Sequence, residues 1–146
     1  MEEKDRIDYA ALCEALASLS PAARRRLVEE ALLHGYAAKD LAEVMGVSPP
    51  AVSRYTRGSL APSVGAVCRL LMGVDPDLRD HLLIVAARSM WRQLTLLLEN
   101  MPPSSEAEEL LAEIADIVSE RLAHYHLLGR SGGHGRRAGS RNAVNP

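Results

Sequence analysis

The chain has 146 residues, of which 47% are hydrophobic, and its formal net charge is −2. A chain of this length holds one ordinary domain, or a small domain with an oligomerisation element. Phe is absent and only one Trp and four Tyr are present, so the core must be mainly Leu, Val, Ala and Met, which favours an all-α fold. The longest candidate membrane stretch, residues 82–101, contains Arg88, Arg92 and Glu99, which excludes a membrane span. No signal peptide is visible, and we expect a cytoplasmic protein.

Two helices are predicted before residue 35. Asp8 can cap a short helix that runs to Leu19, with leucines spaced four and three residues apart on one face. Ser20-Pro21 combines an N-cap with a proline at the first helical position, which indicates the start of a second helix. Gly35 ends that helix, because glycine readily adopts the left-handed conformation common after helices.

Three short helices are predicted next. The first covers about residues 38–45 and ends at Gly46. The second begins at Ser48-Pro49 and is closed by Gly58. A loop separates it from the third, which covers residues 63–72 before a further glycine interrupts the chain.

Two long helices are predicted between residues 75 and 128. Asp75-Pro76-Asp77 opens the first helix, and Pro102-Pro103 ends it. Ser105 and Glu108 fit a capping box at the start of the second. Both carry an apolar seam, which is Leu83, Ala87, Met90, Leu94, Leu97 and Met101 in the first and Ala107, Leu111, Ile114, Val118, Leu122 and Tyr125 in the second. Because the connection is short, we expect a long antiparallel helical hairpin.

The stretch from Ala38 to Arg57 has the spacing of a helix-turn-helix. Ala42 is small where two helices would cross closely, Gly46 follows in the turn, and Val52 is a branched apolar residue six positions further on. The other inward-facing residues are expected to be Leu41, Met45, Val47 and Tyr55. This combination indicates a DNA-binding motif.

Residues 35–63 and 70–78 resemble the phage-repressor-like (Cro/XRE-type) helix-turn-helix family, as found in small predicted transcriptional regulators of archaea. Their sequences are GYAAKDLAEVMGVSPPAVSRYTRGSLAPS and LLMGVDPDL. The resemblance covers about residues 22–80 and implies a five-helix bundle whose third helix enters the major groove of DNA. The family often has a capping Ser or Thr and then Gln where this chain has Ala37 and Ala38, so a cap and a phosphate contact are lost.

Candidates for contact with DNA lie in and around the second helix of the motif. Arg54 is the best candidate for reading bases, because a guanidinium can bind a guanine edge with two hydrogen bonds. The other candidates for base contact are Ser53, Ser48 and Ala51, the last through a thymine methyl group. The candidates for phosphate contact are Arg57, Lys39, Thr56 and Ser59. The alternative is that the two arginines are merely solvated on a helical face.

Charged residues are unevenly distributed. Residues 73–128 contain ten acidic and four basic residues, whereas residues 129–146 contain four basic and no acidic ones. We expect three parts, which are a helix-turn-helix domain with its N-terminal helix at 1–74, the hairpin at 75–128, and a disordered basic tail from residue 129. The tail arginines either add salt-sensitive affinity for DNA or have no partner.

A run of three arginines, residues 24–26, has two interpretations. The arginines either neutralise phosphate or lie on a solvated face, paired with Glu29 and Glu30 one turn later. The two cysteines, Cys13 and Cys68, are isolated. We expect free thiols, because structural disulfides are rare in a reducing cytosol, and a structural disulfide between them is the alternative.

Catalytic and metal-binding patterns are not visible in the sequence. His124 and His126 are two residues apart, so they point in different directions on a helix, and no Cys or His set has zinc spacing. The chain lacks a phosphate-binding glycine loop, a nucleophile motif and a carboxylate pair. Trp91 beside the apolar seam is better explained by helix packing than by a ligand pocket. We therefore expect no enzyme, no metal, no cofactor and no small-molecule ligand.

These features predict a sequence-specific double-stranded DNA-binding protein. One motif of this type reads few base pairs, so we expect a homodimer through residues 75–128 that spaces two recognition helices about 34 Å apart, one turn of DNA. The simplest role is a transcriptional repressor that occludes a promoter. The alternatives are a protein-binding adaptor that uses the hairpin, or a DNA binder in nucleoid organisation, plasmid partition or defence.

Overall fold

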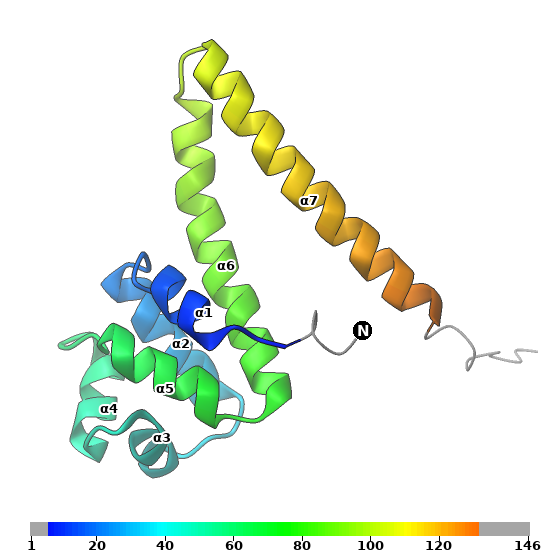
Figure 1. Cartoon of the computed structure of the whole chain (residues 1–146). Coiled ribbons are helices and arrows are strands. Elements are labelled where there is room, and N and C mark those ends of the chain that lie inside the picture. The colour runs from blue at the N-terminus through cyan, green and yellow to red at the C-terminus, as the bar shows by residue number, and fades with distance from the viewer. Residues whose placement is uncertain (1–5, 132–146) are drawn as a thin grey trace, which may run out of the picture. The chain divides into compact units, whose positions relative to one another are not determined.

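The computed structural model describes residues 6–131, and in this range the chain forms seven α-helices and no strand (Figure 1). The helices are α1 (Tyr9–Leu16), α2 (Pro21–Leu33), α3 (Ala38–Met45), α4 (Pro49–Arg57), α5 (Val64–Gly73), α6 (Pro76–Glu99) and α7 (Ser105–Ser131). The predicted all-α class is confirmed. Two compact units are present, of which the first ends at Glu99 and the second begins at Asn100. Within the described range, no helix is both long and apolar enough to cross a membrane.

Helices of the first unit begin where the sequence supplies a capping side chain. The side chains of Asp8, Ser20, Ser48 and Ser63 each accept a hydrogen bond, 3.1 to 3.3 Å long, from the backbone N–H three residues later. Each cap satisfies one of the N–H groups that a helix start leaves unpaired, and is worth about 1 kcal/mol. Helix α3 has no side-chain cap because its N-cap residue is Ala37, as the sequence predicts.

The end of α1 and the start of α7 differ from their predicted positions. Helix α1 stops at Leu16 and not at Leu19, because the next three N–H groups bond to carbonyls three residues back and tighten the chain before the proline of α2. Helix α7 is capped by Ser104 and not by Ser105, since the Ser104 hydroxyl accepts the N–H of Ala107 at 3.1 Å. The predicted capping box of Ser105 and Glu108 is therefore wrong, because the cap lies one residue earlier and the residue three positions after it is Ala107.

The core of the first unit lies among α1 to α5 and the first half of α6. Its largest fully buried side chains are all apolar, and they are Leu16, Leu27, Leu41, Met45, Leu70, Leu71, Leu78, Leu82, Val28, Val52, Val67 and Pro62. Burial along α6 stops at Ala86, and no residue from there to Glu99 is buried. The second half of α6 therefore extends beyond the bundle (Figure 1).

A disulfide joins Cys13 of α1 to Cys68 of α5, with the two Cα atoms 5.6 Å apart. The expectation of two free thiols is therefore wrong. The two residues lie 55 positions apart, and they come together only because α1 packs on α5. Isolated cysteines at such a separation carry no sequence pattern that indicates pairing.

Polar contacts tie α6 to α1 and α2. His81 Nε2 lies 3.0 Å from Glu30 Oε2, and Arg79 donates a hydrogen bond of 3.3 Å to the hydroxyl of Tyr9. The hydrogen bond from His81 is the largest cause of a lowered pKa for the Glu30 carboxyl; burial opposes it, and the neighbouring Arg26 adds to it. On the same helix, Leu78 and Leu82 are fully buried.

The loop before α6 is held by Tyr36. Its hydroxyl donates to Asp75 Oδ2 at 2.8 Å and accepts the N–H of Asp75 at 3.1 Å. Asp75 also caps α6 by accepting the N–H of Leu78 at 3.1 Å. That backbone hydrogen bond, followed by the one from Tyr36, lowers the pKa of the Asp75 carboxyl.

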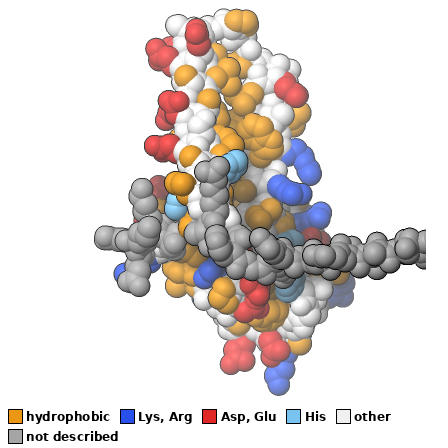
Figure 2. Space-filling view, turned by 90° about the vertical axis from the view of Figure 1, so that its right-hand side faces the viewer, with side chains coloured by type: hydrophobic (Ala, Val, Ile, Leu, Met, Phe, Trp, Pro, Cys, Tyr) orange, Lys and Arg blue, Asp and Glu red, His pale blue; other side chains and the backbone are white. Residues whose placement is uncertain are grey.

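Helix α7 is amphipathic, and most of its large apolar side chains are exposed. Those at least half exposed are Ile117, Val118, Leu122, Tyr125 and Leu127. The second half of α6 also has exposed apolar side chains, among them Trp91 at 54% and Leu97 at 66%. Figure 2 shows hydrophobic and acidic side chains over these long helices. The antiparallel hairpin stays a prediction.

The predicted disordered tail begins inside α7. This helix continues through Gly129 to Ser131, so disorder from residue 129 is wrong for these three positions. The sequence predicts a helix end before Gly129. A helix can nevertheless continue through a glycine, at a cost of about 1 kcal/mol relative to alanine. The rest of the predicted tail, residues 132–146, lies outside the described residues.

Candidate nucleic-acid interface

Helices α3 and α4 form the predicted helix-turn-helix, and Gly46 makes the turn. Gly46 has a φ of 68°, in the left-handed region. The N–H of Val47 bonds to the carbonyl of Ala42 at 2.9 Å, and the N–H of Gly46 bonds to that of Glu43 at 3.2 Å. These bonds satisfy carbonyls at the end of α3 and turn the chain directly into the capped start of α4 at Ser48.

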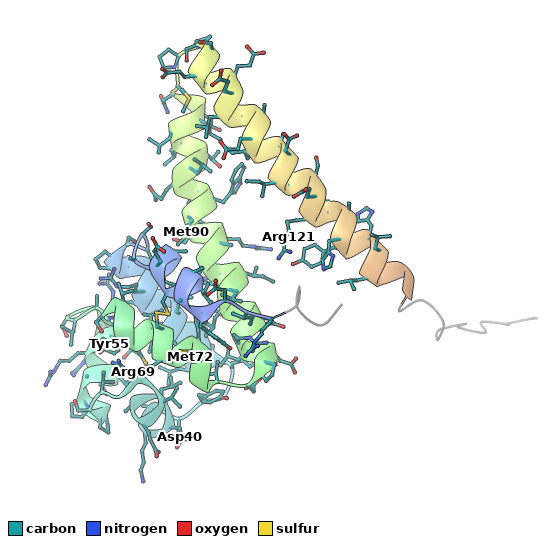
Figure 3. The ribbon with its side chains drawn as sticks, viewed as in Figure 1. Asp40, Tyr55, Arg69, Met72, Met90 and Arg121 are labelled. Atoms are coloured by element: carbon teal, nitrogen blue, oxygen red, sulfur yellow. A yellow bond between two sulfur atoms is a disulfide. The ribbon has the colours of Figure 1, made fainter. Side chains whose placement is uncertain are left out.

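The two helices pack through the predicted apolar set. Ala42 and Val52 are buried, as the motif requires at the helix crossing. Leu41, Met45 and Tyr55 are buried as well, and Val47 is partly buried against the core. Figure 3 shows Tyr55 on α4. Because one face of α4 is buried by packing against the core, contact with a ligand must use the opposite face.

The outer face of α4 carries polar side chains. Ser53, Arg54, Thr56 and Arg57 are exposed. Ala51 differs, because only 8% of it is exposed and it packs in the core. Its methyl group therefore has little surface left for contact with a thymine.

Local hydrogen bonds limit what the hydroxyl groups can donate. Thr56 already donates its proton to the carbonyl of Ser53 at 2.8 Å, and Ser59 donates to the carbonyl of Arg54 at 3.4 Å. A phosphate offers only acceptors, so either hydroxyl must release its present partner to bind one. Ser48 uses an oxygen lone pair to cap α4 and therefore keeps its proton for another acceptor.

Three cations at the interface are exposed. Arg54 and Arg57 lie in the last turn of α4, where positive charge is favoured by the helix dipole. Lys39 lies in the first turn of α3. Among the ion pairs of the described residues, none involves these three side chains. Their charges are therefore available to an anionic partner.

Two of the three arginines in the run of α2 make contacts within the fold. Arg24 donates two hydrogen bonds, one of 2.8 Å from Nε to the carbonyl of Pro62 and one of 2.7 Å from Nη1 to the carbonyl of Leu19. Arg26 pairs with Glu30 one helical turn later at 3.3 Å, as the second interpretation expects. Carbonyl partners such as Pro62, 38 positions away, leave no pattern in the sequence.

Arg69 of α5 was not recognised from the sequence. Its Nε donates a 2.7 Å hydrogen bond to the carbonyl of Met45, the last residue of α3 (Figure 3). The one available signal was a single charged residue inside the otherwise apolar helix 63–72. A lone arginine on a helix is usually solvated, so this signal indicates no partner.

Metal binding has no support in the described range, where no group of three or more His, Cys, Asp or Glu side chains is arranged to hold an ion. The site therefore consists of cations, hydroxyl groups and one exposed helix face. Such a surface can bind and orient an anionic polymer, since phosphate oxygens accept hydrogen bonds from all of these groups.

Residues 28–72 match a protein-family model described as Helix-turn-helix, which confirms the resemblance drawn from the sequence. The match spans α3, the turn, α4 and nearly all of α5, and begins inside α2. Comparison with curated proteins and with solved structures finds no match to the chain.

Proposed function

We propose that this chain, whose residues 28–72 form a DNA-binding helix-turn-helix domain of the Cro/XRE type, is a sequence-specific binder of double-stranded DNA that acts as a homodimeric transcriptional repressor. The observation that carries the proposal is the division of α4 into two faces. Val52 and Tyr55 fix one face in the core, and Arg54 and Arg57 are exposed on the other, with no ion-pair partner among residues 6–131. A helix held in this way can enter the major groove as a rigid element.

Base reading is assigned chiefly to Arg54. It lies on the outer face of α4 beside Ser53, and a guanidinium can donate two hydrogen bonds to the O6 and N7 atoms of guanine. Ser48 at the start of the helix still has a hydroxyl proton to donate. Pro49 and Pro50 form the first turn and offer no side-chain hydrogen bond, so the number of bases read by one copy is small.

Phosphate contacts position the domain. Arg57 ends α4 and Lys39 begins α3, and both are exposed cations. Thr56 and Ser59 join them only if their present hydrogen bonds to backbone carbonyls open. Asp40 and Glu43 on α3 are also exposed, and we assign them no contact because carboxylates repel phosphate.

A homodimer through residues 75–128 is the second part of the proposal. The small number of base contacts in one copy requires a second copy for adequate specificity. The bundle buries its own apolar core, whereas α7 and the second half of α6 leave theirs exposed. A repressor of this kind acts by occluding a promoter, and needs no catalytic residue.

The same exposed apolar residues favour a second candidate function. Large exposed apolar patches mark surfaces that bind proteins, so α7 and the end of α6 suit an adaptor that docks another protein. In that case the helix-turn-helix would serve only as a scaffold. Preferential binding of one duplex sequence over bulk DNA distinguishes the repressor from the adaptor.

Selection of bound sequences from random duplexes, followed by gel-shift titration, tests DNA binding. The selected duplex should bind at least a hundred-fold more tightly than bulk DNA. This threshold is set below the usual ratio of specific to non-specific affinity, about 10³ to 10⁷, because few groups read bases. Arg54→Ala should flatten the base preference, with a loss of about 1–3 kcal/mol on the selected duplex. Arg57→Ala should weaken all duplexes alike and lower the salt slope by about 0.9.

Arg6→Ala is the matched control, since Arg6 is exposed, precedes α1 and has no assigned contact. If no duplex binds better than bulk DNA at moderate salt, the sequence-specific function is refuted. The homodimer is tested separately by light scattering of the full chain and of a chain lacking residues 102–146. The truncated chain should be a monomer, and a truncated dimer would contradict dimerisation through the helical hairpin.

A further inference from the structure

The turn between α3 and α4 is held by a side chain from another helix. Arg69 of α5 places its Nε 2.7 Å from the carbonyl oxygen of Met45, although the two residues are 24 positions apart. Met45 ends α3, and its carbonyl is one of the groups that a helix end leaves without a backbone partner. A positive charge there also compensates the negative end of the helix dipole. Arg69 therefore caps α3 from outside the motif.

Arg69 packs closely against Gly46, the glycine of the turn. A Cβ atom at Gly46 would lie 3.2 Å from Arg69 Nε, closer than side chains normally approach, in addition to the strain of its φ of 68°. A Cβ at Gly65 of α5 would lie 3.6 Å from Arg69 Nη1, at ordinary contact distance. The guanidinium thus lies against the turn on one side and against α5 on the other.

Helix α5 is itself well anchored. Cys68, the neighbour of Arg69, is joined to Cys13 of α1. At the C-terminal end of α5, Gly73 packs so closely on α3 that a Cβ there would lie 2.5 Å from Val44 Cγ1. Arg69 therefore links the α3–α4 turn to a helix that is fixed at two further points.

We propose that Arg69 is a positioning residue, which fixes the direction of α4 by holding the end of α3 and the turn against α5. The proposal rests on the DNA-binding function proposed above, because the direction of α4 matters only if that helix is inserted in a groove. Arg69 itself makes no phosphate contact in this assignment. It acts through Met45 and Gly46, which precede the capped start of α4 at Ser48.

The test compares Arg69→Met with the wild-type chain in two measurements. Met keeps much of the apolar stem and removes the donor and the charge. In the first measurement, exchange of the Gly46 and Val47 amide hydrogens should become about ten-fold faster, because the turn opens more readily once its cap is lost. The amide of Leu82 in the core of α6 reports any change in overall stability and should remain within about two-fold.

In the second measurement, affinity for the selected duplex should fall about ten-fold with an unchanged salt slope. A residue that contacts phosphate would instead lower the slope by about 0.9. Arg6→Met is the matched control for loss of one charge, and both of its readouts should equal those of the wild-type chain. If Arg69→Met does not fold, Arg69→Lys is measured in its place, since lysine keeps the charge but not the guanidinium geometry.

The outcomes separate the two proposals. Unchanged exchange at Gly46 and Val47, or a rise matched at Leu82, overturns the positioning role whatever the DNA result. A lowered salt slope also overturns it, because Arg69 would then be a phosphate contact. If the wild-type chain binds no duplex preferentially, the proposed function fails, and amide exchange still decides whether Arg69 holds the turn.

Discussion

Removal of the Cys13–Cys68 disulfide should destabilise the first unit by a large fraction of its folding free energy. The bridge joins residues 55 positions apart, and closing a loop of that length restricts the unfolded chain. In the chain-entropy description, the restriction is worth about 4 kcal/mol at 25 °C. A domain of this size has a total stability of about 5–15 kcal/mol, so the reduced chain should be only marginally stable.

Urea unfolding followed by far-ultraviolet circular dichroism measures this effect directly, since the signal comes from the helices. Oxidised and reduced chains are compared at the same pH, and thiol alkylation with intact-mass measurement verifies each redox state. With a urea dependence of about 2 kcal/mol per molar, the midpoint should fall by about 2 M on reduction. The slope should rise slightly, because an unfolded chain without the bridge exposes more surface.

A variant with Cys13→Ser and Cys68→Ser provides the control. It should unfold near the midpoint of the reduced chain and should not respond to reductant. Coincident midpoints for oxidised and reduced wild-type chains would refute the loop-entropy reasoning. A loss of stability that the double variant does not share would indicate that the reductant acts elsewhere.

Two further predictions concern packing and pH. Gly73→Ala should lower stability by about 1–3 kcal/mol in thermal unfolding, because the new Cβ would lie 2.5 Å from Val44 Cγ1. Gly65→Ala is the control and should be neutral or stabilising, since its Cβ would meet nothing closer than 3.6 Å. Equal effects of the two substitutions would contradict the close approach of Gly73 to α3. The pKa of Glu30 is depressed, chiefly by His81, so its contribution to stability is complete above its ordinary value of 4.5 and is lost as the pH falls through the lower folded value. The free energy of unfolding from urea titrations should therefore fall more steeply below pH 4.5 for the wild-type chain than for Glu30→Gln, and parallel curves would show that the contact adds nothing.

Local patterns predicted most of the first unit because its helices are punctuated by residues with one clear conformational preference. Ser20-Pro21 and Ser48-Pro49 start helices as expected, and Gly46 and Gly58 end them with positive φ. The crossing residues Ala42 and Val52 are buried as the motif requires. These signals act within about six residues, and short-range signals are the ones a single sequence displays.

Contacts between distant residues were not predictable in the same way. The disulfide, the Arg24 bond to Pro62 and the Arg69 bond to Met45 join positions 55, 38 and 24 residues apart. Each depends on how helices pack. Every residue has a backbone carbonyl, so the sequence does not indicate which carbonyl accepts a hydrogen bond. The low exposure of Ala51, a predicted base contact, was also not visible in the sequence, because the face it occupies depends on the packing of α4.

The proposed DNA-reading surface of α4 has few base contacts, which explains why its support by Arg69 of α5 matters for recognition. Few groups on α4 can read bases, since Val52 and Tyr55 are buried and Thr56 has already donated its proton. When recognition depends on one guanidinium, a small change in helix direction displaces that contact entirely, because hydrogen bonds weaken steeply beyond their preferred distance and angle. A surface with many readers would tolerate such a change, and one that relies on Arg54 would not. The proposed role of Arg69 and the proposed need for a second copy therefore follow from the same scarcity of contacts.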